Sequence, residues 1–336
     1  MPLNFQLHHA HRYFASGTPL LRLGRFAIVS ALLSVFALIN PAAAETRVVI
    51  GTPGRVSDNS LAVSVAIDKG YYKAAGLDVE LVDFKGGAPS IQALVGGGVQ
   101  YVIAAPEHVV RLRQRGVDGV ASFALQNTHT YVLLAKDSSP VKSFEDLKGK
   151  RVGITSAGSL TENLIRLQAK RSGLDYDSDI DVVGAGVGAA QKAAIDSDRI
   201  DAGMFGNIDA LQLIDSGYHV VFDWREQRIP GLGLLTLASW QDEHPEVAKG
   251  IVQATLKAQK LILSDRETSI NGLKKLYPDL DPQIIEKVAD GLQTSLSTDG
   301  RFSQSEFDDL QKDLVEIEPN LPKVEYAVAF PGQFLN

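Results

Sequence analysis

The chain has no cysteine among its 336 residues, and basic residues are in the minority, with 33 Lys and Arg against 40 Asp and Glu. Without cysteine there is no disulfide, no thiol nucleophile and no zinc–thiolate site. A formal net charge of −7 makes nucleic acid and anionic membrane surfaces poor partners, because both are themselves negative. The sequence therefore excludes thiol chemistry and disfavours polyanionic partners.

Acidic residues are absent from the first 44 residues. Arginines precede an apolar run at 26–39, and small residues at 41–44 follow it. The run is shorter than the about 20 apolar residues that a membrane-spanning helix needs, and the order of these parts is that of a secretory signal peptide. We expect cleavage after Ala44 and export of the remainder to a bacterial periplasm; an uncleaved N-terminal anchor is the alternative.

From Arg47 onward, short apolar stretches with the pattern of strands alternate with stretches of helical periodicity. The clearest strands are Arg47–Gly51, Tyr101–Ala105, Val120–Leu125 and Arg151–Thr155. Strands that alternate with helices over short connections predict a mostly parallel sheet covered on both faces. The length of the chain favours two such lobes.

The stretch 143–158 starts the second lobe in this interpretation. Its strand leads through a serine-containing loop into a helix, where Ser159 and Glu162 have the spacing of a capping box. Free backbone N–H groups at such a helix start favour an anion or a polar ligand head.

The character of the sequence changes near residue 244, where helical periodicity replaces the alternation. We expect helices at about 266–276 and 282–295, and a last helix that Ser303 caps. Residues 244–318 are predicted to form a helical cap that packs back on the first lobe.

Patterns typical of catalysis or of cofactor binding are weak. There is no G-x-S-x-G nucleophile motif, and the histidines after the leader, His108, His129, His219 and His244, lack the spacing of metal ligands. Residues 184–189 match G-x-G-x-x-A, but no acidic residue ends the next strand, as a dinucleotide site requires. We therefore expect no catalytic residue, no metal and no cofactor.

Four stretches carry a family resemblance: 69–82 (KGYYKAAGLDVELV), 91–105 (IQALVGGGVQYVIAA), 143–154 (SFEDLKGKRVGI) and 193–205 (AAIDSDRIDAGMF). With them the chain resembles the substrate-binding proteins of ABC importers, in the nitrate, sulfonate, taurine and thiamine-precursor group. The likeness extends over the whole chain after the leader. Each stretch alone is weakly specific, but four in register behind a leader identify the group.

The resemblance implies an α/β fold of the type II periplasmic-binding-protein class, in which two lobes joined by two crossing strands close on a ligand. We place the crossings at about 132–137 and 233–238. Lobe one would comprise 45–134 plus 236–336, and lobe two would comprise 135–235.

The implied function is capture of a small polar organic ligand and its delivery to the membrane permease of an ABC importer. Sulfonates, nitrate-like anions, pyrimidine precursors of thiamine and aromatic carboxylates are all open as ligands. Such a protein would act as a monomer and do no chemistry. Two alternatives stay open. One is a eukaryotic group, also similar to this chain, that makes the thiamine pyrimidine on the same fold but carries a cysteine-rich motif. The other is a periplasmic sensor subunit.

Loops at the carboxyl ends of the strands would surround the ligand in such a fold. We expect ligand contacts from Arg55, Ser57, Gly86, Gly87, Ser90, Pro106, Asn127, Ser156, Ser159, Thr161, Phe205, Asn207 and Trp224. Arg55 would clamp an anionic head; capping, tight turns or core packing are the structural alternatives for the others. Because cations are sparse in these loops, a single anionic head or a neutral heterocycle is favoured over a dianion. Ser156, Ser159 and Thr161 should face residues 86–90 across the cleft.

Overall fold

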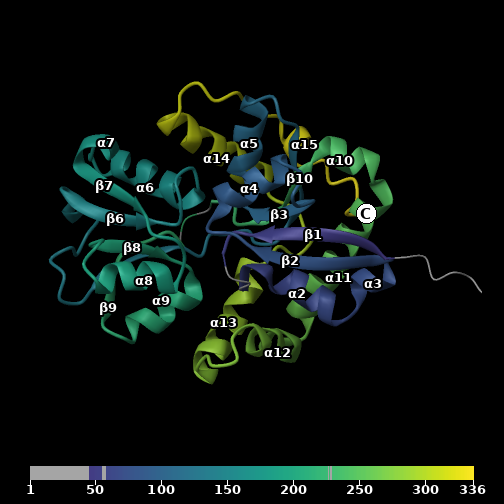
Figure 1. The fold of residues 1–336 in the computed structure, drawn as a ribbon, viewed down its shortest axis with the longest axis horizontal. Helices are drawn as coiled ribbons and strands as arrows, with labels where there is room; N and C mark the ends of the chain where they lie inside the picture. Colours follow the sequence, from purple (N-terminus) through teal and green to yellow (C-terminus); the bar gives the residue numbers. More distant parts are fainter. Residues whose placement is uncertain (1–44, 55–57, 226, 228) are drawn as a thin grey trace, which may run out of the picture. The chain divides into compact units, whose positions relative to one another are not determined.

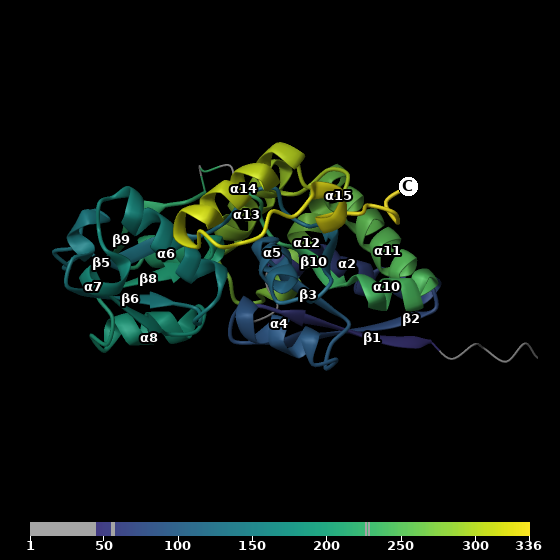
Figure 2. The same ribbon diagram turned by 90° about the horizontal axis from the view of Figure 1, so that it is seen from above.

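Two five-stranded sheets organise the chain, and a computed structural model shows both in Figures 1 and 2. The first sheet has the order β2 (Leu77–Asp83), β1 (Thr46–Thr52), β3 (Tyr101–Ala104), β10 (Gly233–Leu237) and β4 (Gly119–Ala124). The second has the order β7 (Ile180–Gly184), β6 (Lys150–Ile154), β8 (Ala202–Phe205), β5 (Val132–Lys136) and β9 (Tyr218–Asp223).

The structure describes residues 45–54, 58–225, 227 and 229–336. The expected signal peptide with its cleavage site after Ala44 lies outside the described residues, and so do Arg55 and Ser57. Residues Glu45–Asn336 form one compact unit that contains both sheets. No helix in the part of the chain that the structure describes is long and apolar enough to cross a membrane.

Both sheets are mixed, and they share one arrangement of strand directions. In the first sheet β1 runs parallel to β2 and β3, while β10 is antiparallel to β3 and β4. In the second sheet β6 runs parallel to β7 and β8, while β5 is antiparallel to β8 and β9. The expected α/β class with largely parallel sheets is therefore confirmed, with one antiparallel strand inserted in each sheet.

Helices cover both faces of each sheet, which explains why the central strands are apolar throughout. Figure 1 shows α2 (Leu61–Asp68) and α3 (Tyr71–Ala74) on one face of the first sheet, with α4 (Gly87–Val95) and α5 (Glu107–Gln114) on the other. Around the second sheet, α6 (Leu160–Arg171) and α7 (Tyr176–Asp179) lie opposite α8 (Ala189–Asp196) and α9 (Asn207–Ile214). Every residue of β3, β4 and β8 is buried as a result.

The chain passes between the two sheets at different positions from those we expected. All of β5 pairs within the second sheet and all of β10 pairs within the first. Among the described residues, the crossings therefore lie just before these strands, at 125–131 and 229–232, because a strand cannot pair in one sheet and span to the other at once. The expected lobe boundaries at 134 and 235 fall inside the two strands, and the division into lobes stays a prediction.

Helices fill the C-terminal part of the chain, at α10 (Ala238–Glu243), α11 (Pro245–Ser264), α12 (Arg266–Leu276), α13 (Pro282–Ser295), α14 (Gln304–Ile317) and α15 (Tyr326–Ala329). Helix α11 packs on α2 and α3, as expected of a cap on the first lobe. However, α13 also packs on α9, and α14 packs on both α5 and α6. The cap therefore joins elements of both sheets, because the apolar face of α14, with Phe307, Leu310 and Leu314 buried, lies between α5 and α6.

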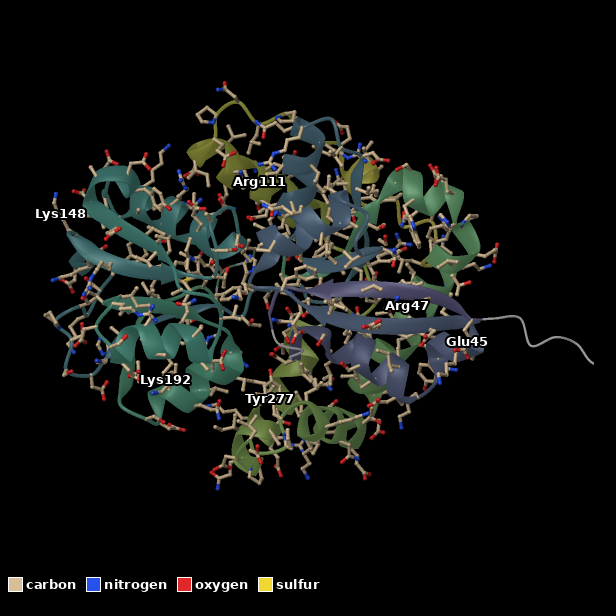
Figure 3. The ribbon with its side chains drawn as sticks, in the orientation of Figure 1. Glu45, Arg47, Arg111, Lys148, Lys192 and Tyr277 are labelled. Atoms are coloured by element: carbon tan, nitrogen blue, oxygen red, sulfur yellow. The ribbon has the colours of Figure 1, made fainter. Side chains whose placement is uncertain are left out.

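Charged side chains lie on the surface of the second-sheet elements, as Figure 3 shows for Lys148 and Lys192. Two short 3-10 helices complete the elements, at Asp58–Ser60 and Glu145–Leu147. Lys148 pairs with Asp179 at 3.1 Å, and its side chain stays 69% exposed.

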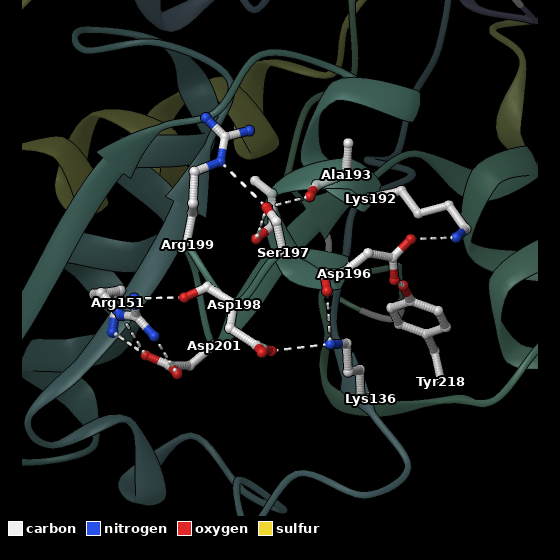
Figure 4. A network of polar contacts seen from close by, with 11 residues as sticks. Lys136, Arg151, Lys192, Ala193, Asp196, Ser197, Asp198, Arg199, Asp201 and Tyr218 are labelled. Carbon is white, nitrogen blue, oxygen red and sulfur yellow. Dashed lines mark hydrogen bonds and ion pairs between the residues drawn. The ribbon is translucent and has the colours of Figure 1, made fainter.

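A polar network closes the edge of the second sheet where its parallel strands begin (Figure 4). Arg151 at the start of β6 donates from Nη2 to Asp201 Oδ1 (2.9 Å) and from Nε to Asp201 Oδ2 (3.1 Å). Lys136 at the end of β5 reaches Asp198 Oδ1 at 2.9 Å. These charges are paired within the protein, so the ligand site must be sought at the opposite edge, where the parallel strands end.

Candidate functional site

A cavity of about 470 Å³ lies where the carboxyl-end loops of both sheets meet. Pro53 and Gly54, which follow β1, line it together with Asp58 and Asn59. The second sheet supplies Tyr131, Thr155, Val187, Gly188, Ala189, Met204, Gly206, Ile208, Asp209 and Gln212. The segment between α12 and α13 supplies Tyr277, Pro278, Asp279 and Leu280; Figure 3 labels Tyr277. Elements far apart in sequence thus enclose one space.

The electrostatics of the cavity are acidic. Asp58, Asp209 and Asp279 line it, and among the lining residues that the structure describes there is no Lys, Arg or His. Burial raises the pKa of Asp58 to about 6, and the neighbouring negative charge of Asp209 raises it in the same direction. Burial and the charges of these two aspartates raise the pKa of Tyr131 to about 12. Asp58, Asp209 and Tyr131 therefore share one negative environment.

The 3-10 helix after β1 supplies polar groups to the lining of the cavity. The backbone N–H of Asp58 donates to Tyr277 Oη at 3.3 Å, which ties the 3-10 helix to the C-terminal helices. The Oδ1 atom of Asn59 is buried and has no hydrogen-bond partner among the described residues. A buried acceptor without a donor is costly, and a ligand N–H group would satisfy it. Within the described ranges, no group of three or more acidic or histidine side chains is placed to hold a metal ion.

The glycine-rich loop before α4 contacts the start of α6, as we expected. The backbone N–H of Ala88 donates to Ser159 Oγ at 3.1 Å, and Ser156 Oγ lies 2.7 Å from Ser159 Oγ. A Cβ at Gly86, where φ is 117°, would lie 2.5 Å from Ser156 Oγ, so only glycine permits this approach. The expectation that Ser156 and Ser159 face this loop is confirmed.

The other residues predicted in these two loops have structural partners. Ser90 Oγ donates to Gly87 O at 2.7 Å and closes its own turn. Thr161 Oγ1 accepts from the backbone N–H of Thr155 at 3.0 Å and is fully buried, so it does not face the loop. Gly87 approaches another buried group, since a Cβ there would lie 3.1 Å from His108 Nε2.

The capping box that we expected at α6 forms only in part. Ser159 is the N-cap residue, but its side chain makes no capping bond. Its hydroxyl instead accepts from Ala88, and Glu162 accepts from the backbone N–H of Gly158, one residue before Ser159. The Ser159 hydroxyl therefore bonds the loop before α4 instead of capping its own helix.

Phe205 and Trp224 lie in the core and not against the cavity, at 1% exposure each. The Trp224 ring packs against Phe222 (4.6 Å between centroids) and Phe144 (6.2 Å). Stacking of either side chain on a ligand would require this packing to open. In this structure both side chains therefore serve as core residues, which was the structural alternative for them.

The remaining predicted residues also have partners within the protein. Pro106 is buried at the N-cap of α5, the Asn127 backbone N–H donates to Ser295 O at 2.8 Å, and Asn207 Oδ1 accepts from Arg225 Nη1 at 3.1 Å. None of the predicted residues that the structure describes lines the cavity. Their chain neighbours Thr155 and Gly206 do line it. The sequence therefore pointed to loops that border the cavity, but not to the residues of those loops that line it.

Sequence reasoning missed Asp58, Tyr131, Asp209 and Tyr277. Asp58 has the pattern of a helix cap and Tyr131 that of a strand start, and neither pattern points to a ligand. Asp209 follows the predicted Asn207 by two residues, and this closeness was the one feature of the sequence that could have pointed to it. Tyr277 comes from the helical cap, where no loop at a strand end marks it.

A second contact joins the two sets of elements through a partly buried network of Glu107, Arg111, Asn163 and Glu318, which we call the Asn163 network. Asn163 Nδ2 donates to Glu107 Oε1 at 2.6 Å, and Arg111 Nη2 donates to Asn163 Oδ1 at 2.9 Å. Arg111, labelled in Figure 3, also pairs with Glu318. Burial raises the pKa of Glu107 to about 7, although the charge of Arg111 acts in the opposite direction. This contact links α5 to α6 and to the end of α14.

Known proteins resemble the chain in sequence and in structure. It is 25% identical over 325 residues to YtlA of Bacillus subtilis, whose name describes a binding protein, with 90% of this chain and 93% of that protein covered. It is 28% identical over 236 residues to the 4-amino-5-hydroxymethyl-2-methylpyrimidine phosphate synthase of Legionella pneumophila, with 67% and 72% covered.

A solved structure with a similar fold is that of the alkanesulfonate-binding protein SsuA from Xanthomonas axonopodis, bound to MOPS. Its TM-score is 0.70 at 20% identity, with 85% of this chain and 98% of that chain covered. The similarity shows the fold of the periplasmic binding proteins. The family model described as NMT1/THI5 like matches residues 57–269, more than half of the chain. The chain therefore belongs to the NMT1/THI5-like family.

Proposed function

We propose that this protein is the extracytoplasmic solute-binding protein of an ABC importer. It captures a small polar organic ligand in the cavity and delivers it to a membrane permease. The observation that carries the proposal is the cavity of about 470 Å³ at the carboxyl-end loops of both sheets. Its volume lies within the about 300–1,000 Å³ of small-molecule sites, and its position is the usual one for ligands of α/β sheets. The family and the fold support the same role.

Closure of the two sheets on the ligand is the expected motion. Among the described residues the chain crosses between the sheets at 125–131 and 229–232, so a rotation needs changes in few backbone torsions. Ligand affinity then comes from burial between preorganised loops and requires no chemical step. Export through a leader cleaved after Ala44, a periplasmic location and a monomeric state belong to the same proposal.

The four ligand classes that the sequence leaves open are sulfonates, nitrate-like anions, thiamine pyrimidine precursors and aromatic carboxylates. A thermal-shift screen of the purified protein across these classes, with nucleotides and divalent metals added, tests the proposal. A bound ligand raises Tm by mass action, and calorimetry then gives its Kd. If only metals or nucleotides raised Tm, capture of a small organic ligand would be refuted.

A pair of glycine variants tests whether the cavity is the site. Gly206 lines the cavity, and a Cβ added there would meet nothing within 4 Å, so Gly206→Leu places a side chain in open space. Gly291→Leu is the matched control, because a Cβ there also meets nothing within 4 Å and Gly291 does not line the cavity. We expect Gly206→Leu to abolish the ligand-induced shift and Gly291→Leu to keep it. Equal binding by both variants would place the ligand elsewhere.

An enzyme is the second candidate, because the Legionella relative is named as a pyrimidine phosphate synthase. The chain lacks the cysteine that the similar eukaryotic group carries, and no histidine is among the described residues that line the cavity. Mass spectrometry of each bound ligand after prolonged incubation separates the two roles. An importer component returns the ligand unchanged, whereas a new product mass would favour the synthase. Co-purification with a receptor in place of a permease would favour the sensor.

A further inference from the structure

One side of α6 contacts elements that lie outside the second sheet, from the N-cap of the helix to its last residue. The residues on this side recur at intervals of four: Ser159, Asn163, Leu167 and Arg171. Side chains four residues apart are neighbours on a helix surface, and at about 1.5 Å per residue these turns extend over about 18 Å. We call these four residues the α6 stripe.

The first half of the α6 stripe makes polar contacts with the loop before α4 and with α5. Ser159 Oγ accepts from the backbone N–H of Ala88 at 3.1 Å. Asn163 Nδ2 donates to Glu107 Oε1 at 2.6 Å, and Asn163 Oδ1 accepts from Arg111 Nη2 at 2.9 Å. Because Ser159 and Asn163 are about one turn apart on one helix, a rigid movement of α6 away from α4 and α5 would break all three bonds together.

The middle of the α6 stripe is apolar. Leu167 lines a space of about 20 Å³ together with Leu310 and Leu314 of α14. This space is far smaller than the about 300 Å³ at which small-molecule sites begin, so the two helices are packed closely and enclose no ligand site here. Ile229, in the second crossing segment, lines the same space. The packing therefore extends to one of the segments about which the sheets would rotate.

The last turn of the α6 stripe is ionic. Arg171 Nη2 lies 2.5 Å from Asp313 Oδ1 and 3.3 Å from Glu316 Oε1, both on α14. The neighbouring Lys170 Nζ donates to the backbone carbonyl of Glu316 at 2.5 Å. The Arg171 side chain is 37% exposed, so this end of the stripe can be altered without a change in the core.

We propose that the α6 stripe is a latch for the closed arrangement: its contacts form together when the two sheets close around the cavity and break together when the sheets open. The inference rests on the closure motion of the proposed function. A ligand that needs the closed arrangement binds in proportion to the population of that arrangement. The stripe therefore adjusts affinity by setting this population.

The latch acts on the cavity without touching its contents. No residue of the α6 stripe is among the described residues that line the cavity, but Thr155, four residues before Ser159, does line it. The backbone N–H of Thr155 donates to Thr161 Oγ1 at 3.0 Å, within the first turn of α6. Movement of α6 is thus transmitted directly to the wall of the cavity.

The test measures closure in the full-length protein without ligand. The chain has no cysteine, so a pair of spin labels can be attached at Gln92→Cys and Ala193→Cys alone. Both positions are exposed, on α4 and α8, which cover different sheets (Figure 2). Pulsed electron paramagnetic resonance then gives the distribution of distances between the labels. In the parent pair we expect a predominant short distance.

Two variants of the α6 stripe should open the protein. In Asn163→Leu and in Arg171→Met we expect an added population that is longer by more than about 2 Å, as in hinge rearrangements. Arg151→Met is the matched control, since Arg151 pairs with Asp201 within the second-sheet elements and its side chain is 39% exposed, against 37% for Arg171. The control should keep the distances of the parent pair.

A charge reversal tests the ionic end by itself, at the surface of the protein. Arg171→Asp should open the protein further than Arg171→Met, because three acids would then face one another. Adding Asp313→Arg should restore the short distance. Failure of the second change to restore it would mean that Arg171 does not act through this pair.

The latch would be overturned by distances that match the parent pair in both Asn163→Leu and Arg171→Met, since the stripe would then be a fixed part of the fold. Shorter distances in these variants would show that the stripe opposes closure, and a parent that is wholly open would show that the latch does not hold; either result also overturns the inference. Failure of the proposed function looks different. In that case no organic compound raises Tm, while the distances, which need no ligand, still respond to Arg171→Met.

Discussion

The cavity and the Asn163 network both lie where elements of the two sheets meet, and each contains a buried carboxyl group. At Glu107 the neighbours are an amide donor and a cation, Asn163 and Arg111. At Asp58 the charged neighbour is another carboxyl, Asp209. Burial raises the pKa of both groups, to about 7 and about 6, but the first charged neighbour lowers it in one case and raises it in the other.

The difference shows that one fold places buried acids in two different electrostatic settings. Where the protein supplies the partners, the carboxyl joins α5 to α6 and helps to hold the two sets of elements together. At Asp58 the carboxyl accepts hydrogen bonds from the Tyr277 hydroxyl and from backbone N–H groups, but its charged neighbour is another acid, and it borders the cavity.

The largest effect is expected from Arg111→Met, which removes the cation from the Asn163 network. Glu107 and Glu318 would then lose their shared partner, and Glu107 is 1% exposed. Leaving the buried Glu107 without its neighbouring cation should lower the free energy of unfolding by about 3 kcal/mol, measured by urea unfolding at neutral pH. The loss should shrink toward about pH 5, where Glu107 is protonated.

Lys312→Met on α14 is the control for that variant, because its pair with Asp309 is exposed (74% and 62% of the side chains). An equal change in the two variants would mean that the Asn163 network contributes no more than a surface pair.

The next effect concerns the contact between the glycine loop and Ser156. Gly86→Ala forces a φ of 117° on alanine and places its Cβ 2.5 Å from Ser156 Oγ. We expect a loss of about 2 kcal/mol in unfolding free energy and weaker ligand binding. Gly97→Ala is the matched control: it has φ of 74° and nothing within 4 Å of the added Cβ.

Adding Ser156→Ala to Gly86→Ala should recover part of the loss, because it removes the atom that clashes. If the double variant were no more stable than Gly86→Ala, the close approach would not be the cause.

A smaller effect of opposite sign is expected for Asp58→Asn without ligand. A carboxyl whose pKa is higher in the folded than in the unfolded protein stabilises the fold at low pH and loses that contribution as pH rises through the folded value. Removing this charge should therefore raise the unfolding free energy by about 1 kcal/mol above about pH 7 and change it little near pH 4. Thermal melts at both pH values check this, and destabilisation at neutral pH would contradict it.

The smallest effect is expected for Lys148→Ala, which lies in neither contact region. Its pair with Asp179 leaves the lysine side chain 69% exposed. Such pairs contribute about 0–1 kcal/mol, so stability and ligand Kd should both stay close to those of the parent protein. A clear loss of ligand affinity would place functional weight on the turn before β6.

The sequence predicted local structure well because strand and helix patterns are local. The helices at 266–276 and 282–295 and the strand near 151–155 follow from periodicity and from capping residues, and the structure has them as α12, α13 and β6. The predicted facing of Ser159 and the 86–90 loop was also correct. It depended on the family resemblance and not on pattern alone.

The site itself was not predictable in this way. Asp58 and Tyr277 are 219 residues apart and meet only because the C-terminal helices pack against elements of both sheets. Thr155 lines the cavity and its neighbour Ser156 does not, and the same holds for Gly206 and Asn207. This choice depends on the backbone path through each loop, and the periodicity of a sequence carries no information about loops.

By itself, the sequence determined that this is an α/β protein with strand-end loops suited to ligand binding, because apolar periodicity and glycine placement act over a few residues. Only the tertiary structure decided where the chain crosses between the sheets and that α14 packs on both α5 and α6. It also decided that an acidic cavity is lined by residues no motif had marked. The physical reason is that burial and charge–charge interaction, which give Asp58 and Glu107 their properties, arise from neighbours distant in sequence.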